Sequence, residues 1–208
     1  PFPITAAGVS CTNGELRPFA LKVHNGFMYA GAICSGEYDL ATSDDLDSFI
    51  FKMDLSDTAS GFSVEFTFEM GTYLRDTTWN QPLMYWKTWY YCEQNPSTAC
   101  VSPMITGLDF DLDENMIIAV VDRDGHTMGY NNYYPNSTAT GQTYSEGDIL
   151  KACWTGSGYV LEGNSPQCNQ TFWDVNNETL EFFIGDSGPV NLWYHRDVSQ
   201  GAVRFNRR

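Results

Sequence analysis

A pair of β-hairpins that occurs twice along the chain is the feature that most restricts its fold. In the first copy, residues 19–34 form two apolar runs around Asn25-Gly26, and residues 47–68 form two more around Ser60-Gly61. Asn-Gly between alternating apolar runs predicts a tight hairpin, because its residues accept a positive φ easily. The first copy therefore predicts four antiparallel strands.

The second copy repeats this order. Residues 104–124 contain two runs joined by the acidic turn Asp113-Glu114-Asn115, and residues 147–162 contain two more around the turn at 155–158. Two hairpins in each unit, recurring after tens of residues, are typical of a β-propeller blade. The expected fold is all-β, with antiparallel four-stranded blades of an incomplete β-propeller and long loop insertions.

The predicted organisation is a single all-β region over residues 1–208. It consists of unit one at about 19–69, an aromatic insertion at 70–103, unit two at about 104–162 and the start of a further unit at about 193–208. Two units and a start cannot close a ring, since propellers have at least four blades. We expect the missing blades in sequence beyond this chain, which begins without Met, or in another chain.

The charge of the chain excludes two classes of partner. The formal net charge is −15 at pH 7. Such a surface repels the phosphates of nucleic acids and of anionic membranes. The sequence also contains no apolar run of about 18 residues, which a membrane-spanning helix would need. We therefore expect neither nucleic acid nor a membrane span.

Cysteines and glycosylation motifs indicate an oxidising, secretory environment. The six cysteines form no CxxC pair, and an even number favours three disulfides. Six cysteines allow 15 pairings, and the layout of strands favours neighbours: Cys11–Cys34, Cys92–Cys100 and Cys153–Cys168. Asn-x-Ser/Thr occurs at Asn136, Asn169 and Asn177, all in polar stretches that read as loops.

The aromatic insertion suggests two alternative roles. Its aromatic rings could pack against another chain or blade, or could stack on sugar rings in a lectin-like site. Large aromatic side chains left exposed would form an improbable patch on a monomer, so burial is favoured. The candidate residues for an interface or for sugar stacking are Trp79, Tyr85, Trp86, Trp89, Tyr90 and Tyr91.

Ca²⁺ is the only cofactor that the sequence suggests, and the candidate site for it is weak. Asp109, Asp111 and Asp113 resemble the start of a calcium loop. However, alternate residues of a strand lie on one face, whereas a calcium loop wraps around its ion. Glu114 also stands where an EF-hand loop has glycine. Both departures argue against an EF-hand, and a shallow Ca²⁺ site at the turn remains an alternative.

The string Asp122-Arg123-Asp124-Gly125-His126 is the most site-like cluster of polar residues. A carboxylate beside a histidine could orient a general base or bind a metal ion. The alternative is structural, with the acids pairing with Arg123 and capping the strand end while His126 bonds to backbone. No nucleophile motif accompanies the string, and GxSxG, HExxH and a Walker loop do not occur. The sequence predicts no enzyme.

Three segments resemble a known group of proteins. They are PMITGLDFDLDENMIIAVVDRDGHTMGY at 103–130, GDILKAC at 147–153 and WYHRDVSQGAVRF at 193–205. They are similar to propeller-type repeats of large secreted surface proteins, among them mastigoneme-like proteins of heterokonts and related bacterial surface proteins. The resemblance implies extracellular structural or adhesive work, and it carries over no catalytic residue.

Together these patterns predict a secreted, non-catalytic structural glycoprotein. It would be located at the cell surface or in an extracellular appendage, as a subunit of a mastigoneme-like filament made with other copies of itself or with related chains. The alternative is a glycan-binding or adhesion module that uses residues 79–92, with or without Ca²⁺.

Overall fold

The computed structural model describes residues 7–72, 74–75, 84–95, 100–129, 131–133, 138–141, 147–162, 168, 172–173, 180–181 and 204. Within them, two four-stranded antiparallel sheets form the body of the molecule. The first sheet has the order β1-β2-β3-β4 and the second has the order β12-β11-β8-β7. The prediction of a mostly-β chain with two four-stranded antiparallel units is therefore confirmed, while the described residues form no closed ring of sheets.

The elements of the two sheets follow the predicted hairpins. The first sheet consists of β1 Leu16–His24, β2 Phe27–Cys34, β3 Asp47–Asp54 and β4 Ser63–Glu69. The second sheet consists of β7 Pro103–Phe110, β8 Met116–Asp122, β11 Gly147–Trp154 and β12 Tyr159–Leu161. Further two-residue strands are β5 Leu74–Arg75, β6 Met84–Tyr85, β9 Asn132–Tyr133, β10 Thr140–Gly141, β13 Phe172–Trp173 and β14 Leu180–Glu181.

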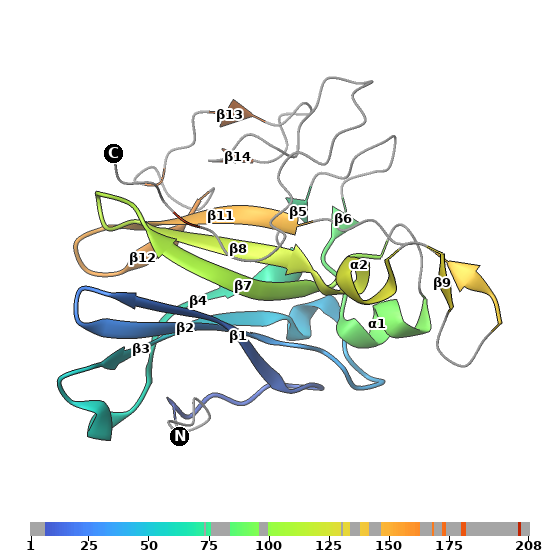
Figure 1. The fold of residues 1–208 in the computed structure, drawn as a ribbon, viewed down its shortest axis with the longest axis horizontal. Helices are drawn as coiled ribbons and strands as arrows, with labels where there is room; N and C mark the ends of the chain where they lie inside the picture. Colours follow the sequence, from blue (N-terminus) through green and yellow to red (C-terminus); the bar gives the residue numbers. More distant parts are fainter. Residues whose placement is uncertain are drawn as a thin grey trace.

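Helical structure among the described residues is short. The α-helices are α1 Trp89–Gln94 and α2 Arg123–Met128, and 3₁₀ turns occur at Ser43–Asp45, Thr58–Ser60 and Met70–Thr72. Figure 1 shows the two sheets stacked face to face, with α1 and α2 at one end and the turns of the main hairpins at the other. No helix in these ranges is both long and apolar enough to cross a lipid bilayer.

The hairpin turns have the backbone geometry that their sequences predict. Asn25 and Gly26 have φ values of 46° and 83°, the left-handed pair that a type I′ turn requires. Gly156 and Gly61 supply a positive φ in two of the other turns. Glu114 has a φ of 65°, in the left-handed region that is unfavourable for residues other than glycine. Contacts of its side chain must therefore offset this backbone strain.

The first strands of the two sheets share an irregularity. The pairing of β1 with β2 shifts between Pro18 and Ala20, and the pairing of β7 with β8 shifts between Ile105 and Gly107. The extra residue is Phe19 in β1 and Thr106 in β7, in each case the fourth residue of the strand. A bulge increases the local twist of a strand. The two sheets therefore match in strand order and in the position of this bulge.

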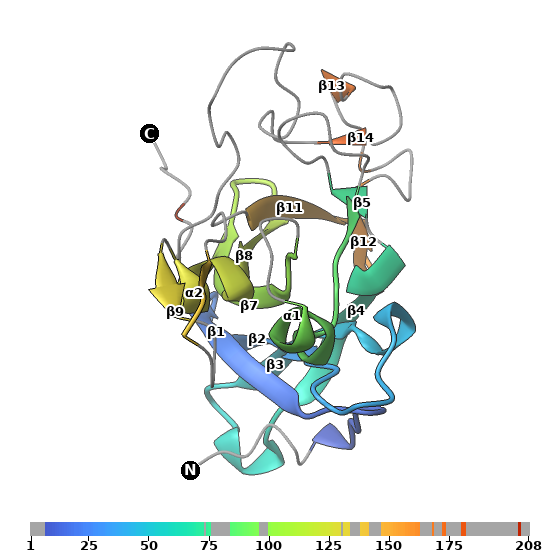
Figure 2. The same ribbon diagram turned by 90° about the vertical axis from the view of Figure 1, so that its right-hand side faces the viewer.

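The sheets approach most closely along their first strands, where β1 and β2 pack against β7. Figure 2, seen from the end that carries the helices, shows β1 beside β7. A Cβ added at Gly31 would lie 2.7 Å from the Cγ2 of Ile105, so only glycine fits this contact. On the side of the fourth strands, the rings of Phe66 and Tyr159 lie 6.1 Å apart and fill the space between the sheets.

Three disulfides attach loops to this framework. They join Cys11 to Cys34, Cys92 to Cys100 and Cys153 to Cys168, and no cysteine of the chain is free. These are the three neighbouring pairs that the strand layout favours. Cys34 ends β2 and Cys153 lies in β11, so two of the bridges anchor a flanking segment directly to a sheet.

Candidate functional site

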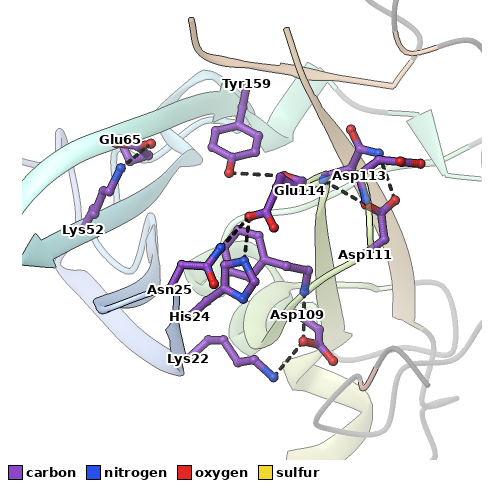
Figure 3. A network of polar contacts seen from close by, with 12 residues as sticks. Lys22, His24, Asn25, Lys52, Glu65, Asp109, Asp111, Asp113, Glu114 and Tyr159 are labelled. Carbon is purple, nitrogen blue, oxygen red and sulfur yellow. Dashed lines mark hydrogen bonds and ion pairs between the residues drawn. The ribbon is translucent and has the colours of Figure 1, made fainter. Parts of the chain in front are cut away.

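A network of polar contacts joins the two sheets at the end where the hairpins turn (Figure 3). The Nε2 atom of His24, the last residue of β1, lies 2.7 Å from Oε2 of Glu114. Asn25 donates from Nδ2 to the same oxygen at 3.0 Å. Glu114 lies in the turn between β7 and β8, so its carboxylate links the first hairpin of one sheet to the first hairpin of the other.

Aromatic packing fixes the histidine of this network. The ring of His24 stacks on Phe110 with centroids 4.2 Å apart and an interplanar angle of 8°. Tyr29 contacts the same Phe110 ring at 4.8 Å. Tyr159 of β12 also reaches this network: its hydroxyl lies 3.4 Å from the backbone oxygen of Glu114. Burial raises the pKa of Tyr159, so its hydroxyl stays protonated.

These contacts make the network an inter-sheet clamp. A histidine–carboxylate pair orients a base in many enzymes, but that chemistry needs a nucleophile or a substrate within reach of the second ring nitrogen. Here the ring of His24 is held against Phe110, and the carboxylate of Glu114 receives donors from both residues of the opposing hairpin. The clamp stabilises the stacking of the sheets, and it explains how Glu114 tolerates a left-handed backbone.

Replacing Glu114 by alanine should lower the free energy of unfolding by about 1–2 kcal/mol, because His24 is buried and loses its partner. Alanine keeps the Cβ atom and so leaves the backbone strain unchanged. Asp113→Ala, one residue earlier and exposed, is the matched control and should change stability by less than about 0.5 kcal/mol. Urea denaturation of both variants measures the difference, and equal losses would argue against the clamp.

The three aspartates of the weak Ca²⁺ candidate do not gather around a common point. Asp109 pairs with Lys22 at 2.7 Å, and Asp111 pairs with Lys151 at 3.2 Å. Asp111 also accepts from the backbone N–H groups of Asp113 and Asn115, both at 2.9 Å. Among the described residues, no group of three or more acidic, histidine or cysteine side chains is arranged to hold a metal ion.

The carboxylate of Asp111 is the organising group of the β7–β8 turn. Burial alone would raise the pKa of Asp111, but the donors from Asn115, Asp113 and Lys151 hold that pKa below its ordinary value. The carboxylate therefore stays ionised and holds the turn in shape as an Asx-type loop. The alternating aspartates that resemble a calcium loop in the sequence serve here as partners for two lysines and for the backbone.

Asp122 of the site-like string acts as a helix cap. Its Oδ1 accepts from the backbone N–H groups of Ser102 at 2.9 Å and Asp124 at 3.0 Å, and its Oδ2 accepts from that of Gly125 at 3.1 Å. Arg123 pairs with Glu93 of α1 at 2.7 Å. His126 lies exposed in the last turn of α2. These contacts favour a structural role for the string, but with partners that differ from the expected ones: Arg123 pairs with Glu93, and Asp122 caps the start of the helix α2.

Asp124 makes the stability of this region depend on pH. Burial raises its pKa from 3.8 to about 6, with Arg123 opposing the shift and Glu93 adding to it. A carboxyl group with a raised folded-state pKa contributes stability below its unfolded pKa and loses it as the pH rises through the folded value. Asp124→Asn should therefore melt higher than the native chain above pH 6 and at nearly the same temperature near pH 4. Melting curves of both proteins between about pH 4 and pH 7 test this prediction. Melting temperatures that change with pH in parallel in the two proteins would contradict it.

The described aromatic residues of residues 70–103 pack mainly within the chain. Trp86 and Trp89 are buried in the same core as the inner faces of both sheets. Trp89 donates from Nε1 to the carbonyl of Pro103 at 2.9 Å, and the guanidinium of Arg123 lies 4.3 Å from its ring centroid. These two tryptophans, expected at an interface or a sugar site, therefore have no face free for a partner or a sugar ring.

The tyrosines of this segment differ in exposure. Tyr91 on α1 is 49% exposed, with the Nζ of Lys87 5.8 Å from its ring, and Tyr90 is half-buried. Tyr85 belongs to β6, but its side chain lies outside the described residues. Trp79 and the glycosylation motifs at Asn136, Asn169 and Asn177 also lie outside them, as does the expected further unit at 193–208 apart from Arg204.

Sequence reasoning missed the clamp. His24 and Glu114 lie 90 residues apart, and neither belongs to a motif. The available signal was indirect: each stands in or beside the first hairpin turn of its unit, so stacking two equivalent units brings the turns together. Comparison with known families, with curated proteins and with solved structures found no match to this chain.

Proposed function

We propose that this chain is a secreted, non-catalytic structural glycoprotein that serves as a subunit of an extracellular filament or appendage. The observation that carries the proposal is the stacking of two equivalent four-stranded sheets. They share strand order and bulge position, and they lie close along their first strands. Adjacent blades of a propeller stack in this manner, and rigid repeated sheets suit a building element.

The disulfides support an extracellular location. Three bridges in a chain of 208 residues are typical of proteins that work in an oxidising environment. The similarity of residues 103–130 and 147–153 to repeats of secreted surface proteins, mastigoneme-like proteins included, points in the same direction. Burial of Trp86 and Trp89 weighs against the glycan-binding alternative, because it removes the best sugar-stacking rings.

The contacts of three carboxylates support a structural role. The carboxylates of Asp111, Asp122 and Glu114 hold a turn, cap a helix and link the two sheets. Each is engaged by donors of the chain itself. A network that is satisfied in this way rigidifies and specifies a packing arrangement, which is what a subunit of a durable assembly requires.

Electron microscopy of the secreted chain tests the proposal. Negative-stain images of native material, and of the full chain secreted from a eukaryotic host, should show elongated assemblies of repeated units. The reduced protein serves as the control and should lose them as its sheets loosen. Isolated globular particles at every concentration, in both sources, would contradict the proposed function.

A further inference from the structure

The asparagine of the clamp, Asn25, is followed by a glycine, and this pair of residues can undergo a covalent change that needs no enzyme. The backbone nitrogen of the residue after an asparagine can attack the side-chain amide. The attack is easiest when that residue is glycine, because glycine has no side chain to shield its nitrogen. The chain contains two such pairs, Asn13-Gly14 and Asn25-Gly26, and the structure gives them different surroundings.

The first pair is held on several sides. A Cβ added at Gly14 would lie 2.5 Å from the backbone nitrogen of Gly36, so this glycine packs tightly against the chain. The carbonyl oxygen of Asn13 accepts from the backbone N–H of Tyr38 at 3.1 Å. Cys11, two residues earlier, is fixed by its disulfide. The side chain of Asn13 therefore has little freedom to turn toward the nitrogen of Gly14.

The second pair lacks this packing. Asn25 and Gly26 are both exposed at the tip of the first hairpin, and a Cβ added at Gly26 would meet no atom within 4 Å. The paired residues of β1 and β2 end at His24 and Phe27, so the nitrogen of Gly26 lies beyond the ladder. The amide of Asn25 is bonded to the half-exposed carboxylate of Glu114. A hydrogen bond that faces water contributes little net free energy, so this amide can turn away from Glu114.

We propose that Asn25 is a site of spontaneous deamidation and that its reaction opens the clamp. The backbone nitrogen of Gly26 gives its proton to water or hydroxide and forms a bond to Cγ of Asn25. The bond between Cγ and Nδ2 breaks, and the nitrogen leaves as ammonia. Water then opens the five-membered succinimide at either of its carbonyl groups, which yields aspartate or isoaspartate. The reaction consumes water alone and involves no oxidant or reductant.

Each product removes a contact on which the clamp depends. Figure 3 shows the amide of Asn25 beside the carboxylate of Glu114, and 3.0 Å separates Nδ2 from Oε2. An aspartate at position 25 replaces this donor by a second carboxylate, which the first one repels. An isoaspartate adds a methylene group to the backbone, so the two-residue type I′ turn is lost. This modification goes beyond the proposed function and does not depend on it.

Peptide mapping of the full secreted chain by mass spectrometry tests the site. During incubation of the folded chain at mildly alkaline pH, Asn25 should be converted about tenfold faster than Asn13 or more, because a restrained pair reacts only when the structure opens locally. Enzymatic methylation of isoaspartate identifies that product. The control is the same chain reduced and unfolded in urea, in which the two pairs should react at similar rates.

Two variants test the effect on the clamp. Asn25→Asp reproduces one product, and Asp-Gly still suits a type I′ turn, so the change is confined to the contact with Glu114. This variant should melt about 2–4 °C below the native chain at neutral pH. Asn25→Gly is the matched control: Gly-Gly also suits the turn, and the donor is removed without a new charge. It should melt between the other two, and incubation should not lower its melting temperature.

Three results would overturn the inference. The first is a folded chain that keeps Asn25 intact after the unfolded control has reacted. The second is conversion of Asn13 as fast as that of Asn25 in the folded chain. The third is an Asn25→Asp variant that melts at the temperature of the native chain. Electron microscopy tests the filament separately, so failure of either proposal leaves the other standing.

Discussion

Replacing Phe110 by alanine should lower the free energy of unfolding by about 4 kcal/mol, the loss typical of a fully buried phenylalanine. Phe110 ends β7, has no exposed surface and belongs to the core shared by both sheets. Its ring supports His24 by stacking at 4.2 Å and contacts Tyr29 of the opposite sheet at 4.8 Å. The substitution would open a cavity and loosen the clamp at the same time.

Chemical denaturation of Phe110→Ala measures this loss. Leu112→Ala, two residues further along the chain and largely exposed, is the control and should change stability by less than about 0.5 kcal/mol. The loss in Phe110→Ala should also exceed that in Glu114→Ala, because the aromatic ring contributes to both the core and the clamp. A loss in Phe110→Ala below about 1 kcal/mol would be incompatible with a core common to the two sheets.

Removing the disulfide between Cys11 and Cys34 should lower the free energy of unfolding by about 3.5 kcal/mol in the chain-entropy estimate. The bridge joins residues 23 positions apart and fixes the N-terminal segment to the end of β2. That segment supplies Ala7 and Val9, which pack on the outer face of the first sheet. Loss of the bridge would free this cover as well as enlarge the unfolded ensemble.

The double variant Cys11→Ala/Cys34→Ala tests this expectation, with alanine chosen because Cys34 is fully buried and a serine hydroxyl would be left there among apolar groups. The matched comparison is Cys92→Ala/Cys100→Ala, whose bridge spans only 8 positions. That variant should lose less, about 2.5 kcal/mol, since the closed loop is shorter. An equal or reversed order in thermal and urea unfolding would count against the role assigned to the N-terminal segment.

The local part of the fold follows from the sequence, because hairpins are encoded by neighbouring residues. Asn25-Gly26 strongly favours a type I′ turn, and the apolar runs on either side of it pair as the alternation indicates. The same holds for the second unit, where Met116–Asp122 form β8, one of the two central strands of the sheet. The favoured disulfide pairs also follow from this layout, since each joins segments that hairpin formation brings near.

The long-range part could not be predicted in the same way. The sequence shows that both faces of β2 and β8 are apolar, but not which face of one sheet meets the other. The aromatic insertion illustrates the difficulty: Trp86 and Trp89 have the composition of an interface, yet they fill the chain's own core. The sequence likewise does not show which group a carboxylate will contact. The partners here are lysines for Asp109 and Asp111 and backbone N–H groups for Asp122.

Because β1 and β2 pack closely against β7, while aromatic rings separate the sheets on the side of β4 and β12, the two sheets are not parallel plates. Each leans toward the side of its first strand. Further sheets stacked with the same lean would trace an arc centred beyond β1 and β7, so the curvature of any larger body would be set by small residues such as Gly31 on one side and by ring size on the other.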